Sequence, residues 1–375
     1  MKKIDNTRPD INVLFDYVTV TFPVDENEEF YREDRGLELH ALFANSHFKF
    51  FMNLLNLDPR IYTECGKIEH YANLITYREH INVKFNGPLN TRDINTHALE
   101  LKGEGCREVE RLGINWYIFF AYIHEHDLNV STLHLASDIF TDKYFRIEQL
   151  LKKALSEEYI ASTRNFSYIE SKKSDVKSGT SLYFGRRDDN QVNIYDKKNE
   201  RYYKGFDVDT NTWIRIELRL KTSKSWDFIR LLVSKGIDKL PELYFQVLSS
   251  MLEFKRRSST TDRKERWKIW QPWKHYLGTS TKIKLQNQAR LESTLVKKRD
   301  WLLDSAGKTI LEYFSAIDTS EKEKFLNELI KKKLEKIDNK SLVRVNEYRK
   351  TNNLPEFDSL DQYKGHIKSK LYSLI

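Results

Sequence analysis

The chain has 375 residues, of which 39% are hydrophobic and 31% are charged, so it can bury sizeable cores in two or three domains. No run of 18 apolar residues occurs, and the N-terminal residues lack the apolar core of a signal peptide; we expect neither a membrane span nor a secretory signal. The two cysteines form no CxxC motif, so we expect reduced thiols in a cytoplasmic protein. The net charge of +8 fits a nucleic-acid partner without requiring one.

The N-terminal part of the chain predicts a mixture of strands and helices. Residues 16–22 alternate between apolar and polar side chains and predict a strand that ends at Pro23. Apolar residues at helical spacing over residues 37–57 predict one or two helices. Three further strands are expected over residues 72–77, 81–85 and 98–101.

Two glycines follow the last of these strands. Gly103 and Gly105 predict a tight bend. The segment lacks the Lys-Ser/Thr ending of a P-loop, which argues against a nucleotide site of that kind. Glu100 lies at the end of the strand beside this bend. Taken alone, this glutamate is typical of a solvent-exposed strand position.

A helix is predicted over residues 109–122, and it runs into His124 and His126. These histidines are either a metal-binding His-x-His pair or exposed residues at a helix C-terminus, where a positive charge is favourable. The sequence alone favours the second interpretation, because the middle residue, Glu125, is not apolar and the segment is not a strand.

The strand predicted over residues 130–140 carries His134 and Asp138 on one face. A carboxylate on a largely apolar strand needs a cation or hydrogen-bond donors, because burying it alone is costly. Asp138 is therefore either a metal ligand or a hydrogen-bonded structural residue. A helix over residues 145–155 and a strand over residues 166–170 follow.

A hairpin is predicted between Ser181 and Glu200. Its strands are residues 182–184 and 192–195, and Gly185 with the following Asp and Asn residues turns the chain. Tyr195 lies on the second strand, two residues before Lys197. A tyrosine hydroxyl on a rigid strand beside cations is either a nucleophile for phosphate or a packing residue of the sheet.

The strand predicted over residues 212–220 alternates strictly, with Trp213, Arg215, Glu217 and Arg219 on one face. Such a charged face is either solvated or part of a site that holds both a metal and a phosphate. Two helices follow, over residues 224–233 and 240–254.

A basic segment, residues 255–274, carries eight Lys/Arg against two acids, together with tryptophans at 267, 270 and 273. We expect its cations to contact DNA phosphates and its tryptophans to pack in the core rather than to stack on bases. Beyond Gly278 the sequence is helical, with a break at residues 352–355 and a last helix from Leu360.

Four of these segments together resemble the Rep_trans replication initiators, endonucleases of rolling-circle plasmids that are related to relaxases of some integrative conjugative elements. The resemblance covers roughly residues 15–275. Its motifs are Tyr183-Phe-Gly-x-Arg187 with Ile194-Tyr-Asp-Lys197, Glu100-Leu-x-Gly-x-Gly-Cys-Arg107, the acid Asp138, and Trp213-x-Arg-x-Glu217.

The resemblance implies that Tyr195, and not Tyr183, attacks DNA and forms a 5′-phosphotyrosine link with release of a 3′-OH. It further implies that Arg187 and Lys197 balance the charge of the attacked phosphate. The implied metal is Mg²⁺ or Mn²⁺, held by Glu100, Asp138 and Glu217.

This chain departs from the family pattern on the middle strand. The family usually has Arg-x-Asp-x-x-x-Asp there, whereas this chain has Thr132 for the arginine and His134 for the first acid. The departure leaves open whether His134 binds the metal as an imidazole or has lost that role.

The expected fold is α+β, with antiparallel sheets, packed helices and a helical C-terminal region. We predict an N-terminal α+β region (residues 1–110), a nicking core (111–278) and a helical region (279–375). The expected partner is origin DNA, as a duplex site and an exposed single strand; a host helicase and a second copy of the chain are further candidates. The alternatives are a relaxase that starts conjugative transfer by the same chemistry, and a non-catalytic origin-binding relative.

Overall fold

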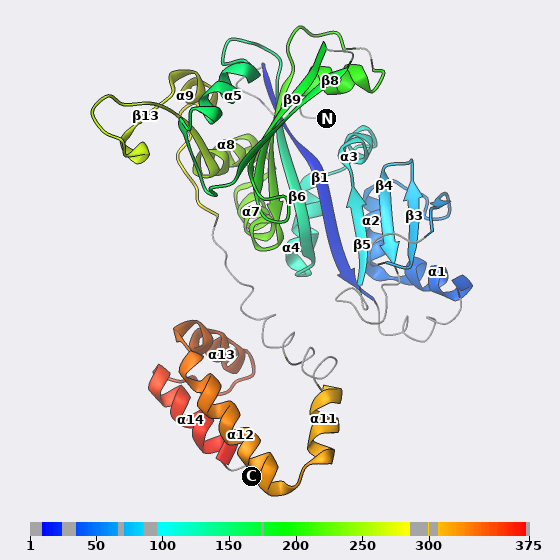
Figure 1. Ribbon diagram of the computed structural model, residues 1–375. Coiled ribbons are helices and arrows are strands. Elements are labelled where there is room, and N and C mark those ends of the chain that lie inside the picture. Colours follow the sequence, from blue (N-terminus) through cyan, green and yellow to red (C-terminus); the bar gives the residue numbers. More distant parts are fainter. Residues whose placement is uncertain are drawn as a thin grey trace. The chain divides into compact units, whose positions relative to one another are not determined.

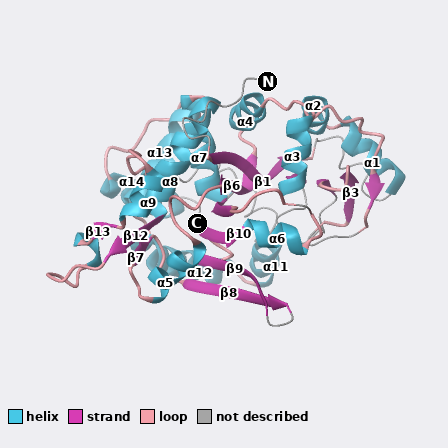
Figure 2. Ribbon diagram, turned by 90° about the horizontal axis from the view of Figure 1, so that it is seen from above, coloured by secondary structure: helices cyan, strands magenta, loops and turns pink. Residues whose placement is uncertain are grey.

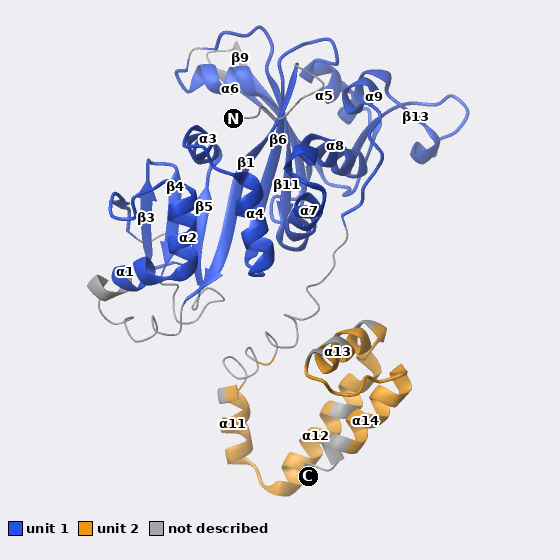
Figure 3. Ribbon diagram, turned by 180° about the vertical axis from the view of Figure 1, so that it is seen from behind, with its two compact units in different colours: residues 1–287 blue, residues 288–375 orange. Residues whose placement is uncertain are grey.

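The computed structural model describes residues 10–24, 35–66, 71–85, 96–173, 176–206, 208–285, 299 and 307–372. The chain forms two compact units, residues 1–287 and residues 288–375 (Figure 3). The first unit contains an antiparallel sheet of ten strands covered by helices, and the described part of the second is helical. The predicted α+β class with a helical C-terminal region is therefore confirmed.

One long sheet runs through the first unit (Figure 1). In spatial order its strands are β2 (Thr63–Glu64), β3 (Asn73–Tyr77), β4 (Ile81–Phe85), β5 (Thr96–Leu101), β1 (Ile11–Pro23), β6 (Asn129–Ile139), β11 (Ile214–Lys221), β10 (Gln191–Asp196), β9 (Val176–Gly185) and β8 (Phe166–Lys173). Strand β1 joins the two halves, because it pairs with β5 on one side and β6 on the other. The sheet thus runs across residue 110, and the predicted three-part division of the chain stays a prediction.

Helices cover one face of this sheet. They include α2 (Ser46–Leu54), α4 (Trp116–Glu125), α7 (Thr222–Lys235) and α8 (Leu240–Met251), which lie in front of the strands when the molecule is seen from behind and on one side of them when it is seen from above (Figures 2 and 3). Helix α1 (Arg35–Ala44) precedes α2.

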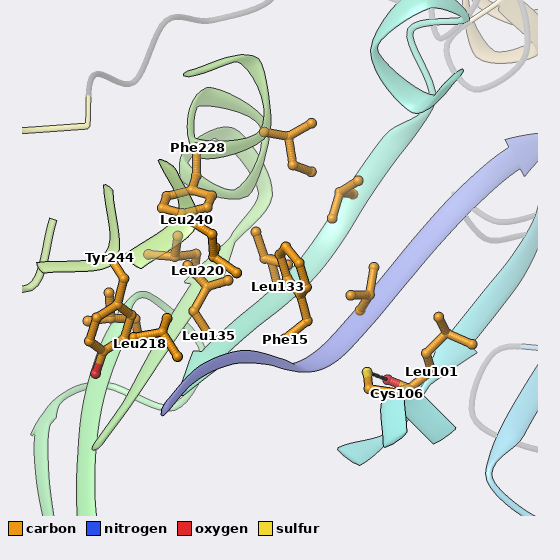
Figure 4. Close-up of a cluster of buried hydrophobic side chains, with 14 of the residues drawn as sticks. Phe15, Leu101, Cys106, Leu133, Leu135, Leu218, Leu220, Phe228, Leu240 and Tyr244 are labelled. Atoms are coloured by element: carbon orange, nitrogen blue, oxygen red, sulfur yellow. Dashed lines mark hydrogen bonds between the residues drawn. The ribbon is translucent and has the colours of Figure 1, made fainter. Parts of the chain in front are cut away.

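The core lies between the sheet and these helices. Leu135 of β6 and Leu218 of β11 are opposite each other in register, fully buried, and packed near Tyr244 of α8 (Figure 4). Each fully buried leucine of this kind contributes about 1.5–3 kcal/mol through removal of apolar surface from water. Because strand residues alternate between faces, the same strands present their other side chains to the opposite face of the sheet.

Two predicted segments differ from the structure near Gly105. The bend expected there is the start of helix α3 (Gly103–Arg111). Glycine is needed at position 105 because a Cβ atom would lie 2.3 Å from the backbone oxygen of His80. The single helix predicted over residues 109–122 is instead α3 and α4, which are separated at Gly113, where φ is +87°.

The connection predicted after the hairpin also contains a helix, α6 (Lys197–Tyr203). The Asp196 side chain caps it by accepting a hydrogen bond from the Asn199 amide at 2.9 Å. The sequence pattern concealed this helix because its residues are almost all polar.

A small sheet and the remaining helices complete the description. The sheet has the order β13 (Lys268–Ile269), β12 (Leu252–Arg256), β7 (Tyr159–Ala161), and beside it lie α5 (Ile147–Leu155) and α9 (Gln271–Leu277). Trp273 is fully buried, so its predicted packing role is confirmed. In the basic segment, Lys255 is buried in an ion pair with Glu253 at 2.8 Å and is not available to DNA.

The second unit contains α11 (Gly307–Ala316), α12 (Thr319–Lys333), α13 (Asn339–Thr351) and α14 (Leu360–Tyr372). Phe357 is buried between the last two helices, with its ring 4.3 Å from the Arg349 guanidinium and 5.2 Å from the Tyr363 ring. In the described parts of both units, no helix is long and apolar enough to cross a membrane.

Candidate active site

The face of the sheet opposite the core carries a row of buried and half-buried polar side chains, which we call the polar face. Its members come from six adjacent strands: Asn82 and Lys84 (β4), Glu100 (β5), Tyr17 (β1), His134 and Asp138 (β6), Arg215, Glu217 and Arg219 (β11), and Gln191, Asn193 and Tyr195 (β10). Burial of so many polar groups is costly unless they pair with one another or with a ligand. The polar face is therefore the strongest candidate for a functional site.

Tyr195 lies opposite Arg215 in the register of β10 and β11, and its hydroxyl donates a hydrogen bond to Glu217 Oε1 at 2.7 Å. Burial, together with the negative charge of Glu217, raises the pKa of the Tyr195 phenol. The phenol therefore keeps its proton, and Glu217 is the group placed to receive it. The Lys197 ammonium lies 5.5 Å from the Tyr195 ring centre and pairs with Glu200 at 2.5 Å.

Glu217 is held as a carboxylate by its neighbours. Arg219 donates to its Oε2 from Nε at 2.9 Å and from Nη2 at 2.7 Å, and Asn193 Nδ2 lies 3.4 Å from the same oxygen. Burial alone would raise the pKa of Glu217, but the charge of Arg219 and the hydrogen bonds from Tyr195 and Arg219 outweigh it and lower the pKa to about 2.

Asp138 has a protein cation as its partner. Arg215 donates to both of its oxygens at 2.7 Å, and the Trp213 indole N–H donates at 2.8 Å. The third guanidinium nitrogen of Arg215 bonds Asp16 at 2.6 Å. This bidentate arrangement satisfies the requirement that the sequence predicted for a buried acid at position 138.

Asp16 is a member of the site that the sequence did not single out. It lies between Phe15 and Tyr17, where the register of β1 against β6 shifts, and such an irregularity re-aims a side chain. Burial raises the pKa of Asp16 even though Arg215 lies beside it. The available signal was an acid inside an otherwise alternating apolar strand.

Glu100 is not brought to Glu217. It accepts hydrogen bonds from Tyr17 and from Asn82 at 2.7 Å, and it pairs with Lys84 at 3.2 Å. Strands β1 and β6 lie between β5 and β11, which separates the two glutamates by three strand spacings, about 14 Å. One ion with oxygen ligands at about 2–2.6 Å cannot contact both.

Arg187 also lies away from Tyr195. It is exposed in the turn between β9 and β10, before Gln191, the first residue of β10, and Tyr195 is four residues beyond Gln191 along that strand. At the rise of a strand, this distance is about 13 Å. The structure thus gathers Tyr195, Lys197, Glu217 and Asp138 at one end of the row and leaves Arg187 at the other.

Two buried polar atoms beside Glu217 have no hydrogen-bond partner, His134 Nε2 and Asn193 Oδ1. Asn193 is directly opposite Glu217 in register, and His134 is opposite Arg219. Burial lowers the pKa of His134 to about 3; the charge of Glu217 opposes this shift and the charges of Arg219 and Lys221 add to it, so the imidazole is neutral.

These atoms decide how well the residues fit a divalent ion. Within the described ranges, no three His, Cys, Asp or Glu side chains are gathered closely enough to enclose one. The predicted trio of Glu100, Asp138 and Glu217 therefore does not form one centre. Of these three acids, only Glu217 has beside it potential metal-ligand atoms that lack a hydrogen-bond partner, namely His134 Nε2 and Asn193 Oδ1.

The histidines at the end of α4 have separate aromatic partners. His124 stacks on Trp226 with ring centres 5.4 Å apart, and His126 stacks on Tyr122 at 4.0 Å. Helix α4 ends at Glu125, three residues beyond the predicted end, and the structure supports the interpretation that these histidines lie at a helix C-terminus.

A solved structure shares this fold. It is that of a rolling circle replication initiator protein from Geobacillus stearothermophilus, which matches with a TM-score of 0.58 and 24% sequence identity over 74% of this chain and 99% of that chain. No curated protein matches the sequence significantly. The family model described as "Replication initiation factor" matches residues 129–330, more than half of the chain. The chain therefore belongs to the Rep_trans family of replication initiation factors.

Proposed function

We propose that the protein starts rolling-circle replication by nicking one strand of an origin with Tyr195 as the nucleophile. The observation that carries this proposal is the 2.7 Å hydrogen bond from the Tyr195 hydroxyl to Glu217 on the polar face of a chain of this family. A half-buried tyrosine held by a carboxylate has a fixed direction of attack and a proton acceptor in place.

In this mechanism the Tyr195 oxygen attacks the scissile phosphorus and its proton passes to Glu217 Oε1. A Tyr–O–P bond forms, the P–O3′ bond breaks, and the departing oxygen takes a proton to become a free 3′-OH. Because the 5′-phosphotyrosine link keeps the energy of the phosphodiester, a later attack by a 3′-OH rejoins the strand without ATP.

Two cations, each already paired with carboxylates, lie near the position proposed for the attacked phosphate. Arg215 is opposite Tyr195, and the Lys197 ammonium is close to its ring. As the phosphorane forms, such fixed cations stabilise its added negative charge. A phosphate that draws Arg219 away from Glu217 would also raise the pKa of Glu217 and make it a better base, because Arg219 is the main charge that lowers it.

A divalent ion, Mg²⁺ or Mn²⁺, belongs to the proposal through the family. Its best-supported position is beside Glu217, where His134 Nε2 and Asn193 Oδ1 supply unpartnered donors. A bound ion there would withdraw charge from a phosphate oxygen. The roles of Glu100 and Asp138 as ligands remain predictions from the resemblance, and each already has a cation partner, Lys84 and Arg215 respectively.

The proposed substrate is origin DNA in the cytoplasm, bound as a duplex and attacked on an exposed single strand. A host helicase and a second copy of the chain remain candidate partners. The test is to incubate the protein with a supercoiled plasmid carrying its origin and Mg²⁺ or Mn²⁺. We expect nicking by the unmodified protein and by Tyr183→Phe, and none by Tyr195→Phe.

The outcomes of this test separate the alternatives. Nicking that survives Tyr195→Phe removes this tyrosine from the mechanism. Binding of the origin without nicking by the unmodified protein supports the non-catalytic relative. Nicking confined to a transfer origin supports the relaxase.

A further inference from the structure

Three cations gather at the turn end of the polar face, away from Tyr195. Arg219 and Lys221 lie on one face of β11, and the turn between β9 and β10 carries Arg187. Asn190 of this turn accepts a hydrogen bond from the Lys221 amide at 3.0 Å, which fixes the turn against the end of β11. Besides burial, the charges of Arg219 and Arg187 lower the pKa of Lys221, so both arginines are within electrostatic reach of this lysine.

The cluster has more positive than negative charge, unlike the rest of the row. Elsewhere Arg215 pairs with Asp138 and Asp16, and Lys84 pairs with Glu100. At the turn end, Arg219 pairs with Glu217.

Lys221 instead donates to the neutral Thr132 hydroxyl at 2.9 Å. Among the described residues, no carboxylate forms an ion pair with Lys221 or Arg187. Holding like charges together is unfavourable unless an anion joins them.

We propose that Arg187, Arg219 and Lys221 form a second phosphate site, which binds a backbone phosphate flanking the one that Tyr195 attacks. The inference rests on the proposed function. The scissile phosphate lies towards the other end of β10, because Arg187 is in the turn that precedes Gln191, the first residue of this strand, and Tyr195 is a further four residues, about 13 Å, along it. A flanking phosphate, one or two nucleotides away, meets the cations if the single strand runs along β10 and β11.

This assignment changes the role of Arg187 from the charge balance of the attacked phosphate to positioning of the strand. Contacts to phosphate carry no base information, so the site serves any sequence equally. They release counterions, which makes the binding sensitive to salt. The site therefore supplies register and affinity, and origin choice must come from other parts of the protein.

The first measurement is the salt dependence of binding by the full chain carrying Tyr195→Phe, with a fluorescent single-stranded oligothymidylate as the probe. Neutralisation of one phosphate of a single strand contributes about 0.7 to the slope of log affinity against log salt, so adding Arg187→Gln and Lys221→Gln should reduce the slope by up to about that amount. Arg187→Gln alone, at an exposed position, should remove half of it.

Arg186→Gln is the matched control. Arg186 lies next to Arg187 in the same turn, but it pairs with Asp188 at 2.9 Å, and its removal should leave the slope unchanged. If Arg186→Gln and Arg187→Gln reduce the salt slope equally, the effect comes from general surface charge, and the proposed phosphate site is refuted. Competition by inorganic phosphate as effective as that by the oligonucleotide would identify a free-anion site and also overturn it.

The second measurement locates the phosphate. Single methylphosphonates, which are uncharged, are scanned on both sides of the mapped nick in the oligonucleotide. One flanking position should weaken binding about tenfold, the effect of losing one charge-assisted contact, and this loss should disappear when Arg187 and Lys221 are both replaced by Gln.

A loss that persists in that double variant, or a loss confined to the scissile phosphate, would refute the proposal. Failure of the proposed function has a different signature. If Tyr195→Phe still nicks DNA, Tyr195 is not the nucleophile, but the methylphosphonate scan can still detect a flanking phosphate site.

Discussion

Replacement of His134 by Gln should change how the stability of the protein depends on pH. His134 faces Glu217, Arg219 and Lys221 of β11 and the ring of Tyr17 of β1, whose centre is 5.0 Å away. Burial lowers its pKa from 6.5 to about 3. Between pH 6.5 and about pH 3, His134 is therefore protonated in the unfolded chain but neutral in the folded chain. The free energy of unfolding falls as the pH falls through this range.

The size of the effect follows from the shift. Where the histidine is fully protonated in the unfolded chain and neutral in the folded chain, the free energy of unfolding changes by about 1.4 kcal/mol per pH unit. Because the histidine of the unfolded chain is only partly protonated at the upper end, the loss from about pH 6 to about pH 4.5 integrates to about 2 kcal/mol. His134→Gln keeps a polar side chain without a titrating group, so this part of the loss should vanish.

Urea unfolding of the full chain in chelating buffer measures the free energy at each pH, and the quantity of interest is the difference between the two pH values. His126→Gln, at an exposed helix end, is the control and should keep the dependence of the unmodified protein. If His134→Gln and the unmodified protein lose the same stability on acidification, the His134 imidazole is not held neutral in the folded protein, and its surroundings on the polar face differ from those described here.

Three other outcomes are expected. Arg215→Gln leaves the buried Asp138 and the half-buried Asp16 without their cation and should cost about 3–5 kcal/mol in urea unfolding, whereas Arg60→Gln, which removes a surface pair with Asp58, should cost far less; equal costs would contradict the buried pairing. Gly105→Ala should destabilise the protein by about 1–3 kcal/mol or more, because its Cβ would meet the His80 oxygen; an unchanged melting temperature would refute that contact. Removal of divalent ions by EDTA should stop nicking and added Mn²⁺ or Mg²⁺ should restore it; full activity in EDTA would remove the metal from the proposal.

The strands of the site were predictable from sequence because alternation is a local property. Apolar residues separate Trp213, Arg215, Glu217 and Arg219 along the chain, and this spacing alone places the four side chains on one face of the strand. The hairpin around Gly185 was equally clear. Helix α6 was missed because its polar residues show no apolar periodicity. Gly105 was misread as a bend residue, since its requirement comes from His80, a neighbour in space.

The pairing within the site was not predictable, because it depends on register between distant strands. Asp138 was expected to need a partner, but nothing local pointed to Arg215, 77 residues away, or joined that arginine to Asp16 across 199 residues. Family motifs nominated Glu100 and Glu217 together, although sheet order separates them. Motifs thus identify the residues of a site more readily than the contacts between them.

The central claim is that Tyr195 forms the covalent bond to DNA, and the direct measurement is to identify the residue that becomes attached. The full chain is incubated with a single-stranded oligonucleotide carrying the nick site, digested with protease, and the DNA-linked peptide is sequenced by mass spectrometry. We predict that the link is on Tyr195, that Tyr195→Phe yields no adduct, and that Tyr183→Phe still does. A link on Tyr183 or Tyr17, or an adduct formed by Tyr195→Phe, would contradict the account.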